Sequence, residues 1–159
     1  MTLPPVPPRL PGLQWRPLHP VDLSALRQML DECVLLDGPH QPQERTVANI
    51  ETDTLAALGT GGRVAAYAWL MAPVRDEQGL RVLLDGRVHP DYRGRGLGRF
   101  LLGWAVARAQ AVATETDVTV YLQITCPRAA YAPTLARAGF RPASPVAGTF
   151  EKTISRLSR

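Results

Sequence analysis

Three glycines alternate with arginines in one short segment of the chain, Arg93-Gly94-Arg95-Gly96-Leu97-Gly98-Arg99. Glycines at this spacing let a ligand approach the backbone N–H groups closely, because they carry no side chain. The apolar residues that follow recur at helical spacing, so these N–H groups would lie at a helix N-terminus, where the helix dipole favours an anion. The segment therefore predicts a phosphate-binding loop with added positive charge from its arginines.

The spacing of the glycines excludes two common phosphate-binding motifs. A P-loop requires Lys and then Ser or Thr after its last glycine, whereas Arg99 and Phe100 follow Gly98. A dinucleotide-binding fingerprint requires G-x-G-x-x-G, and Arg99 or Leu101 stands where its third glycine belongs. A turn that only caps a helix would explain the glycines but not the interleaved arginines.

The motif R-x-x-G-x-G at residues 93–98, preceded by Val-His-Pro-Asp-Tyr, resembles the acetyl-CoA-binding motif of the GNAT family of N-acetyltransferases. Ala138-Gly139-Phe140 is similar to the A-G-F or L-G-F that closes the family's second motif. The resemblance implies an acyltransferase that moves an acetyl group from acetyl-CoA to a primary amine by direct attack in a ternary complex. The acceptor would be a small-molecule amine, a peptide N-terminus or a lysine.

The resemblance also implies which residues bind CoA. Backbone N–H groups of the loop would bind the pyrophosphate, at Arg93, Gly94, Arg95, Gly96, Leu97, Gly98 and Arg99. The strand end near Arg87 and Val88 would pair with the pantetheine arm, whose amides can mimic a strand at an open sheet edge. An N–H there would also face the thioester oxygen, which gains charge during transfer and needs a fixed donor.

Two positions that usually carry proton transfer in this family hold apolar residues here. Val82 stands six positions before Val88, where many members have a glutamate base, and Leu135 stands four positions before Gly139, where a tyrosine acid is common. These departures keep two alternatives open, a catalytically silent acyl-CoA-binding module and transfer of a longer acyl group. The identities of the acid, the base and the acceptor are not fixed by the motifs.

Asp85 and Tyr131 are the candidate replacements for the base and the acid. Asp85 is a carboxylate in an apolar strand, where it needs solvent or a partner, and alternation places it on one face with Arg87. An ion pair between those two is the competing interpretation. Tyr131 lies one helical turn before Leu135 and just ahead of Pro133, which favours the start of a helix. The alternative for Tyr131 is a packed aromatic with a satisfied hydroxyl.

Other reactive side chains receive weaker functional predictions. His40 lies in a loop rich in Gly and Pro and is an alternative base, because histidine titrates near neutral pH. His89 is expected to orient the Val-His-Pro turn. Cys126 has no identifiable companion base, so a buried thiol is favoured over a covalent nucleophile. Two isolated cysteines, Cys33 and Cys126, do not provide a disulfide framework or a metal site.

Composition is that of a globular domain. The chain has 159 residues, of which 45% are hydrophobic and 20% charged, and this length can bury an ordinary core. It contains neither a run of about 18 apolar residues nor the apolar segment of a secretory signal, so we expect a cytoplasmic protein that does not act on membranes. Residues 1–12 are expected to form a proline-rich arm, and residues 13–159 the domain.

Basic residues outnumber acidic ones by 18 to 14, and all of the basic residues except Lys152 are arginine. The net charge of +4 raises the possibility of nucleic-acid binding. The arginines outside the glycine-rich loop are scattered along the chain, however, so the charge points to a phosphate-bearing cofactor and no nucleic-acid partner is expected. Relatives of the family commonly dimerise, which makes a homodimer a candidate assembly.

Periodicity and turn residues predict the elements that must position these groups. Strands are expected at 13–16, 54–58, 64–72, 80–88 and 118–124, with two more within 140–154. Helices are expected from residue 22 to about 31–33, at 43–50, from Leu97 to at least Val112, and at 127–138. The order fits a single-domain α/β fold of the GNAT type, with a mixed central sheet flanked by helices.

Overall fold

One mixed sheet organises the computed structural model, which describes residues 5–39, 49–125, 129–143 and 148–155. Within these residues eight strands pair in the order β1-β2-β3-β5-β6-β8-β7, and β4 also pairs with β5. The strands are β1 (Gln14–Arg16), β2 (Thr54–Leu58), β3 (Val64–Leu70), β4 (Val74–Arg75), β5 (Leu80–Val88), β6 (Val120–Thr125), β7 (Arg141–Pro142) and β8 (Thr149–Ile154). Neighbours are antiparallel except β5 and β6, which are parallel, so the predicted mixed α/β fold is confirmed.

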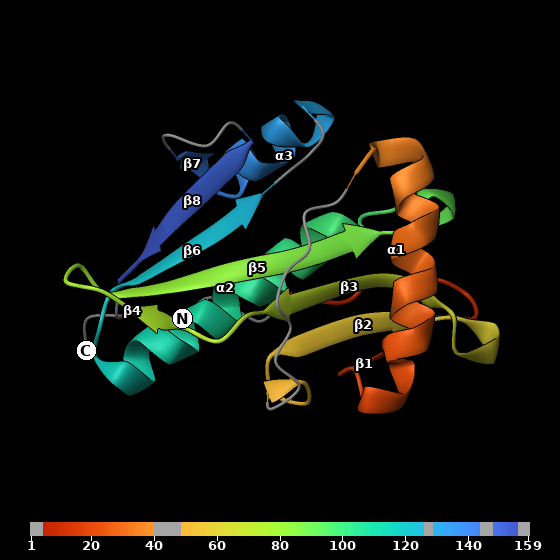
Figure 1. The fold of residues 1–159 in the computed structure, drawn as a ribbon, viewed down its shortest axis with the longest axis horizontal. Helices are drawn as coiled ribbons and strands as arrows, with labels where there is room; N and C mark the ends of the chain where they lie inside the picture. The colour runs from red at the N-terminus through yellow and green to blue at the C-terminus, as the bar shows by residue number, and fades with distance from the viewer. Residues whose placement is uncertain (1–4, 40–48, 126–128, 144–147, 156–159) are drawn as a thin grey trace.

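Two long helices cover opposite faces of the sheet (Figure 1). The helices are α1 (Leu23–Asp37), α2 (Leu97–Thr116) and α3 (Ala132–Arg137), with short 3-10 turns η1 (Pro20–Asp22), η3 (Thr60–Gly62), η4 (Pro90–Tyr92) and η5 (Ala129–Tyr131). β3 is buried along its whole length because its alternate side chains enter both layers. Ala66 and Ala68 pack under α2, whereas Tyr67 and Trp69 pack in the layer that includes α1.

Two predicted helices have different limits in the structure. α1 continues beyond the predicted end at 31–33, because Val34, Leu35 and Leu36 extend the helix until Gly38, whose φ of 81° ends it. The predicted helix 127–138 is shorter in the described residues, where α3 follows the turn η5 and has Pro133 in its first turn. Residues 126–128, and 43–48 of the predicted helix 43–50, lie outside the described residues.

The sheet opens between β5 and β6. Their pairing runs from Leu80 opposite Val120 to Leu84 opposite Ile124, after which β5 continues beside β3 alone. Figure 1 shows the two strands diverging toward their carboxyl ends. The backbone N–H of His89 donates to the Ala65 carbonyl of β3 at 2.8 Å. Because backbone groups alternate along a strand, those of Gly86 and Val88 face the opened gap.

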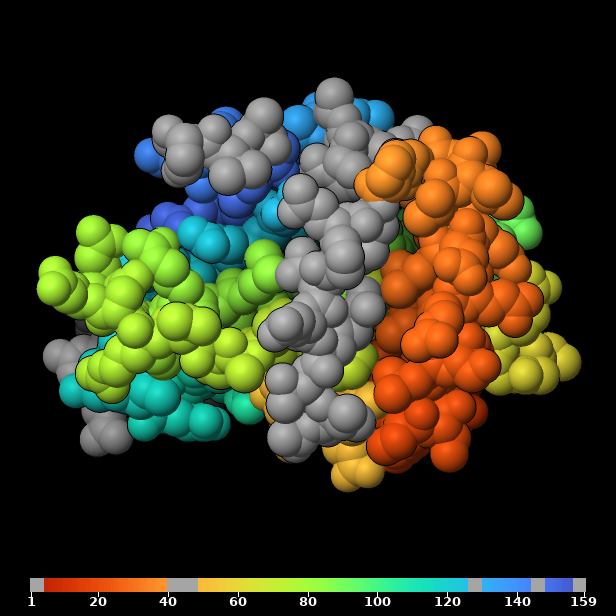
Figure 2. Space-filling model, viewed as in Figure 1, coloured from red at the N-terminus to blue at the C-terminus, as the bar shows by residue number. Residues whose placement is uncertain are grey.

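The described part of the N-terminal segment lies against α2. A Cβ on Gly103 would come within 3.4 Å of the Pro5 ring, and the Trp15 indole N–H donates to the Pro8 carbonyl at 3.3 Å. Residues 1–4 lie outside the described residues, and the division into an arm at 1–12 and a domain at 13–159 stays a prediction. In the space-filling view (Figure 2), α1 forms one flank of the visible face and the turn between β4 and β5 forms the other. None of the described helices combines the length and apolar composition that crossing a membrane requires.

Candidate active site

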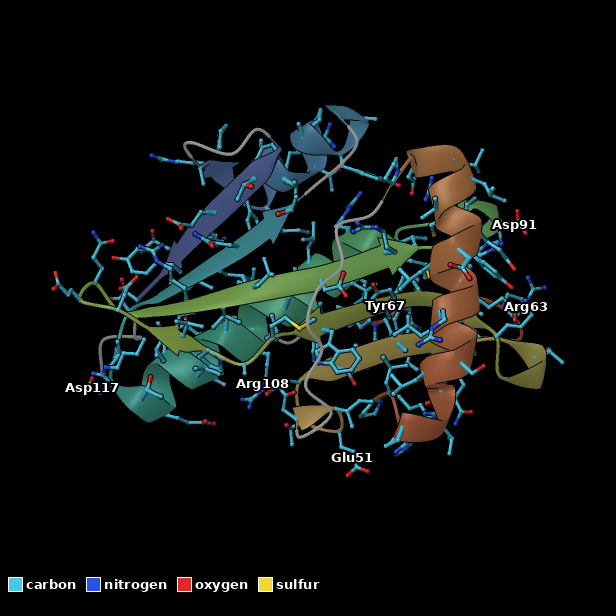
Figure 3. All side chains as sticks on the ribbon, viewed as in Figure 1. Glu51, Arg63, Tyr67, Asp91, Arg108 and Asp117 are labelled. Carbon is cyan, nitrogen blue, oxygen red and sulfur yellow. The ribbon has the colours of Figure 1, made fainter. Side chains whose placement is uncertain are left out.

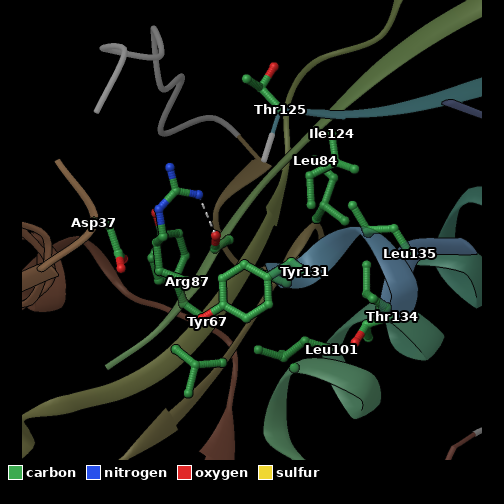
Figure 4. A pocket seen from close by; sticks show the side chains of 15 residues that line it. Asp37, Tyr67, Leu84, Arg87, Leu101, Ile124, Thr125, Tyr131, Thr134 and Leu135 are labelled. Atoms are coloured by element: carbon green, nitrogen blue, oxygen red, sulfur yellow. Dashed lines mark hydrogen bonds between the residues drawn. The ribbon is translucent and has the colours of Figure 1, made fainter. Parts of the chain in front are cut away.

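An apolar cavity occupies the gap between β5 and β6 (Figure 4). Its volume is about 110 Å³, and its walls include Leu84, Leu101, Ile124 and Leu135. A second cavity of about 550 Å³ lies beside the glycine-rich loop. The two cavities meet at residues that line both of them, which are Val88, Gly98, Leu102, Tyr131 and Thr134. They therefore form one continuous cleft from the open sheet to the N-terminus of α2.

The glycine-rich loop presents backbone donors to this cleft. Gly94 and Gly96 have φ angles of 75° and 84°, a left-handed conformation that glycine adopts without strain. The first hydrogen bond of α2 runs from the Phe100 N–H to the Gly96 carbonyl at 3.1 Å. The N–H groups of Leu97, Gly98 and Arg99 therefore have no partner within the helix. Their position at a helix N-terminus is suited to a phosphate group.

The arginines of the loop have separate surroundings. Arg99 lines the cleft, whereas Arg95 lies over the Tyr92 ring at 5.6 Å. The Arg93 guanidinium is bound to Asp37, and its backbone N–H donates to Pro90 at 3.4 Å. Arg93 also lines the cavity beside the loop, and its role in CoA binding stays a prediction.

Guanidinium groups bind both carbonyls that face the gap. Arg87 donates from Nη1 to the Gly86 carbonyl at 2.7 Å, and Arg93 donates from Nε to the Val88 carbonyl at 3.0 Å. Because buried backbone groups need partners, these contacts support the open strand edge where β6 no longer pairs with it. The N–H groups of Gly86 and Val88 remain as the donors that this edge turns toward the cavity.

Asp85 lies behind Tyr67 at one wall of the cavity. The Tyr67 hydroxyl donates to Asp85 Oδ2 at 3.1 Å, and the two side chains are almost fully buried. Tyr67 is opposite Arg87 and Trp69 is opposite Asp85 in the register, so Tyr67 and Asp85 are diagonal neighbours on one face. Figure 3 shows Tyr67 near the middle of the molecule, beside α1. Tyr67 lines the cavity and joins the Asp85 carboxylate to it.

Tyr131 enters the cleft from the other side. It ends the turn η5 directly before α3 and lines both parts of the cleft. In Figure 4 its ring lies in the middle of the view, between Arg87 on one side and Leu101 and Leu135 on the other. Leu135 is buried in the apolar wall. The structure therefore brings Tyr131 and the Tyr67–Asp85 pair to one cavity.

Val82, the other apolar substitution noted in the sequence, is 2% exposed and belongs to the core beneath α2. A group that exchanges protons with an acceptor amine needs access to the cleft. The Val82 side chain offers neither a titratable group nor such access.

His89 stabilises the turn that leads into the loop. It precedes η4, its Nδ1 accepts the Asp91 N–H at 3.1 Å, and its Nε2 contacts the Glu32 carboxylate of α1. The hydrogen bond from His89 lowers the pKa of Glu32. With Nδ1 as acceptor, the proton of a neutral ring lies on Nε2, directed at Glu32. These contacts agree with the orienting role predicted for His89.

The cysteines and His40 add no nucleophile or base to the described site. Burial raises the pKa of the Cys33 thiol, so Cys33 is protonated near neutral pH and poorly suited to covalent transfer. Cys126 and His40, the other candidates from the sequence, lie outside the described residues. Among the described residues, no group of three His, Cys, Asp or Glu side chains could hold a metal ion.

Sequence reasoning missed Tyr67, Asp37 and Arg137 as residues of the cleft. Tyr67 stands in an apolar strand and is typical of a core residue; only the register of β3 against β5 shows its contact with Asp85. Arg137 of α3 lines the cavity beside the glycine-rich loop. Its position directly before Ala-Gly-Phe is the signal that could have identified it. Asp37 gave no signal, because its partner Arg93 is 56 residues away.

Comparisons with known proteins agree with this geometry. The model of the acetyltransferase (GNAT) family matches residues 23–140, whereas no curated protein sequence matches the chain. A GCN5-related N-acetyltransferase from Sphaerobacter thermophilus has a TM-score of 0.62 at 20% identity, over 84% of this chain and 44% of its own length. The ribosomal-protein-S18-alanine N-acetyltransferase of Escherichia coli has a TM-score of 0.57 at 20% identity, over 92% of this chain and 96% of its own.

The yncA protein of Salmonella typhimurium, solved with its cofactor acetyl-CoA, has a TM-score of 0.62 at 19% identity, over 93% of this chain and 96% of its own. At these identities the solved structures establish a shared fold. The family model extends over most of the chain, including both the loop and the Ala-Gly-Phe segment. The protein is therefore a member of the GNAT family of acetyltransferases.

Proposed function

We propose that the protein transfers an acetyl group from acetyl-CoA to a primary amine, which attacks the thioester directly in a ternary complex. The observation that supports this most is the continuous cleft, which joins the anion donors of the loop to the opened edge of β5. A phosphate at one end of such a cleft and a pantetheine arm along the strand match the chemistry that its walls offer. The acceptor would be a small-molecule amine, a peptide N-terminus or a lysine.

The residues present fit acetyl-CoA. N–H groups of the loop and of Leu97, Gly98 and Arg99 would hold the pyrophosphate, with the Arg99 and Arg137 side chains beside it. The apolar walls at Leu84 and Ile124 would exclude water from the pantetheine end. When bound, acetyl-CoA supplies an acetyl thioester, from which an amine displaces the CoA thiolate. The N–H groups of Gly86 and Val88 would stabilise negative charge on the thioester oxygen.

The proton chemistry is assigned to the two walls of the cavity. An amine must lose a proton as its nitrogen bonds to the acetyl carbon, and the Tyr67 hydroxyl can accept that proton while passing its own to Asp85. The departing thiolate needs a proton in turn, which Tyr131 can donate from the opposite wall. In this assignment, Tyr131 and the Tyr67–Asp85 pair perform the proton transfers. The apolar side chains of Val82 and Leu135 cannot perform them.

Arg99→Gln and Arg137→Gln are each expected to weaken acetyl-CoA binding about fivefold at low salt. Both side chains line the phosphate end of the cleft, and an exposed charge contributes a modest, salt-screened attraction. Calorimetric titration at two salt concentrations measures the effect, which should shrink as salt rises. Arg75→Gln, an exposed arginine of β4, is the control. If all three variants bound acetyl-CoA with the wild-type affinity, neither Arg99 nor Arg137 would contribute to binding.

Tyr131→Phe is expected to lower kcat about tenfold with little change in KM for acetyl-CoA. General acids contribute roughly 10²–10⁴-fold, but a thiol with a pKa near 8.5 is a good leaving group and needs less help. Release of free CoA thiol at saturating acetyl-CoA gives kcat. Tyr121→Phe on β6 is the matched control, since its ring lies against Arg81. A wild-type kcat in Tyr131→Phe would show that another group protonates the thiolate.

Thermal shift and thiol release test the proposed function together. Acetyl-CoA should raise the Tm of the wild-type protein, and one or more amines in a panel of small amines and peptides should trigger thiol release. If no CoA thioester raised the Tm of the protein, the proposed function would be wrong. Stabilisation without transfer to any amine would favour a silent acyl-CoA-binding module, which the apolar residues Val82 and Leu135 support. Faster release from propionyl- or butyryl-CoA would identify a longer acyl donor.

A further inference from the structure

An ion pair joins the last turn of α1 to the start of the glycine-rich loop. Arg93 donates from Nη1 to Asp37 Oδ1 at 2.9 Å and from Nη2 to Asp37 Oδ2 at 2.6 Å. The Asp37 side chain is 5% exposed and that of Arg93 is 18% exposed. A planar guanidinium bound at both nitrogens has one well-defined orientation, unlike an exposed pair of flexible side chains.

The same guanidinium also binds the open end of β5. Arg93 Nε donates to the Val88 carbonyl at 3.0 Å, so a single side chain connects α1, the strand edge and the loop. Val88 and Asp37 both line the cavity in the gap, and Val88 also lines the phosphate end of the cleft. The position of the Arg93 side chain therefore sets where the loop begins relative to the strand that should hold the pantetheine arm.

Asp37 also stabilises the charged form of the Arg93 guanidinium. Burial alone would disfavour the charged guanidinium, but the hydrogen bonds to Asp37 and the nearby negative charge of Asp37 leave the pKa of Arg93 raised. All three donor nitrogens of the side chain have protein acceptors. The protein itself therefore accepts hydrogen bonds from Nε, Nη1 and Nη2 of Arg93, with no phosphate group needed.

We propose that Asp37 is a positioning residue for acetyl-CoA binding and acts through Arg93. Its carboxylate fixes the guanidinium that holds the Val88 carbonyl, and so keeps the phosphate loop and the open strand edge in one arrangement before the cofactor arrives. This inference rests on the proposed function. The opposite idea, that Asp37 only restrains a phosphate-binding arginine, predicts that loss of the carboxylate would tighten acetyl-CoA binding.

The chain contains a matched pair far from the cleft. Arg16 donates to Asp22 at 2.8 and 2.9 Å through both terminal nitrogens, and the Asp22 side chain is 8% exposed. This pair lies at the beginning of α1, whereas Asp37 ends that helix. Substitutions in it remove the same kind of buried ion pair without touching a residue that lines either cavity.

The test compares Asp37→Asn with Asp22→Asn by calorimetric titration of acetyl-CoA and by the Tm without ligand. Asp37→Asn should raise the Kd about tenfold, within the usual range of coupling between sites, although both variants lower the Tm. Asp22→Asn should stay within about twofold of the wild type. Arg93→Lys keeps the positive charge but loses the planar guanidinium that binds both carboxylate oxygens. It should raise the Kd for acetyl-CoA as much as Asp37→Asn does, whereas Arg16→Lys should leave the Kd near the wild-type value.

Combining Asp37→Asn with Arg93→Lys should weaken binding no further than either change alone, because both act through one contact. A wild-type Kd, or a lower one, in Asp37→Asn would overturn the inference while leaving the proposed function intact. Should Asp37→Asn fail to fold, Asp37→Ser, which also removes the carboxylate, decides in the same way. A wild-type protein that does not bind acetyl-CoA would overturn the proposed function itself, and this inference with it.

Discussion

Asp85→Asn is expected to lower kcat about 100-fold at saturating acetyl-CoA and amine, at the lower end of the range for general base catalysis. Asparagine has nearly the shape of aspartate and can still accept the hydrogen bond from the Tyr67 hydroxyl, which spans 3.1 Å in the wild type. Its amide cannot take up the proton that the Tyr67 hydroxyl passes on when it accepts one from the amine. Thiol release with the best amine of the panel measures kcat, and acetyl-CoA titration should show an unchanged Kd.

Two further variants make this result specific to the proton path. Tyr67→Phe removes the hydroxyl through which Asp85 reaches the cavity and should reduce kcat to a similar extent. Asp53→Asn removes a carboxylate that binds Arg108 at 2.7 Å, away from the cleft, and should leave kcat near the wild-type value. Full activity in Asp85→Asn would contradict the assignment and move the search for the base to His40 or to bound water.

Gly96→Val is expected to weaken acetyl-CoA binding at least about 100-fold, which corresponds to about 2.8 kcal/mol. Gly96 has a φ of 84° directly before α2, and an L-residue in a left-handed conformation costs roughly 1–2 kcal/mol, more if β-branched. The variant relieves that strain by rearranging the loop, which displaces N–H donors that a pyrophosphate needs. Hydrogen bonds to charged groups contribute about 1.5–3 kcal/mol each, so displacing even one has a large effect.

Gly61→Val is the control for strain alone. Gly61 has a φ of 73° in the turn η3, and apart from its chain neighbours no heavy atom lies within 4 Å of the position where a Cβ would be. Both substitutions should lower the Tm by comparable amounts because they force valine into similar backbone conformations. Acetyl-CoA titration should separate them, with Gly61→Val close to the wild type. Equal affinity of the two variants would mean that the loop does not bind the cofactor.

The fold and the position of the glycine-rich loop at the start of a helix could be predicted because their signals are local in sequence. Residues 93–98 combine a glycine pattern with the start of a helix, and the alternating apolar runs define the strands of the sheet. Helix ends were less predictable: α1 extends to Asp37 because Leu35 and Leu36 continue the helix although both are largely exposed. The amphipathic pattern does not extend into that last turn, whose final residue, Asp37, binds Arg93.

The pairs that organise the candidate site could not be predicted from the sequence. Tyr67 and Asp85 are 18 residues apart, and their contact depends on the register of β3 against β5. Alternation alone placed Asp85 on one face with Arg87, whose side chain binds the Gly86 carbonyl. Asp37 and Arg93 are 56 residues apart, and their contact depends on how α1 crosses the sheet. Such contacts are set by tertiary packing, which periodicity does not encode.

The arginine-rich composition also has a more specific meaning in the structure. Arg16, Arg81, Arg93 and Arg108 each bind a carboxylate of the domain. Arg99 and Arg137 instead line the end of the cleft that is proposed to bind phosphate. Within the described chain, positive charge is thus partly used to join elements and partly directed at the site proposed for the cofactor.

Mass analysis of amines after incubation with acetyl-CoA tests the proposed reaction most directly. The wild-type protein should add one acetyl group to at least one amine of the panel and release one CoA thiol for each acetylated amine. Gly96→Val, which should bind acetyl-CoA poorly, should lose this activity at acetyl-CoA concentrations that support the wild type. A wild-type protein that binds acetyl-CoA but acetylates no amine in the panel would contradict the proposed transfer.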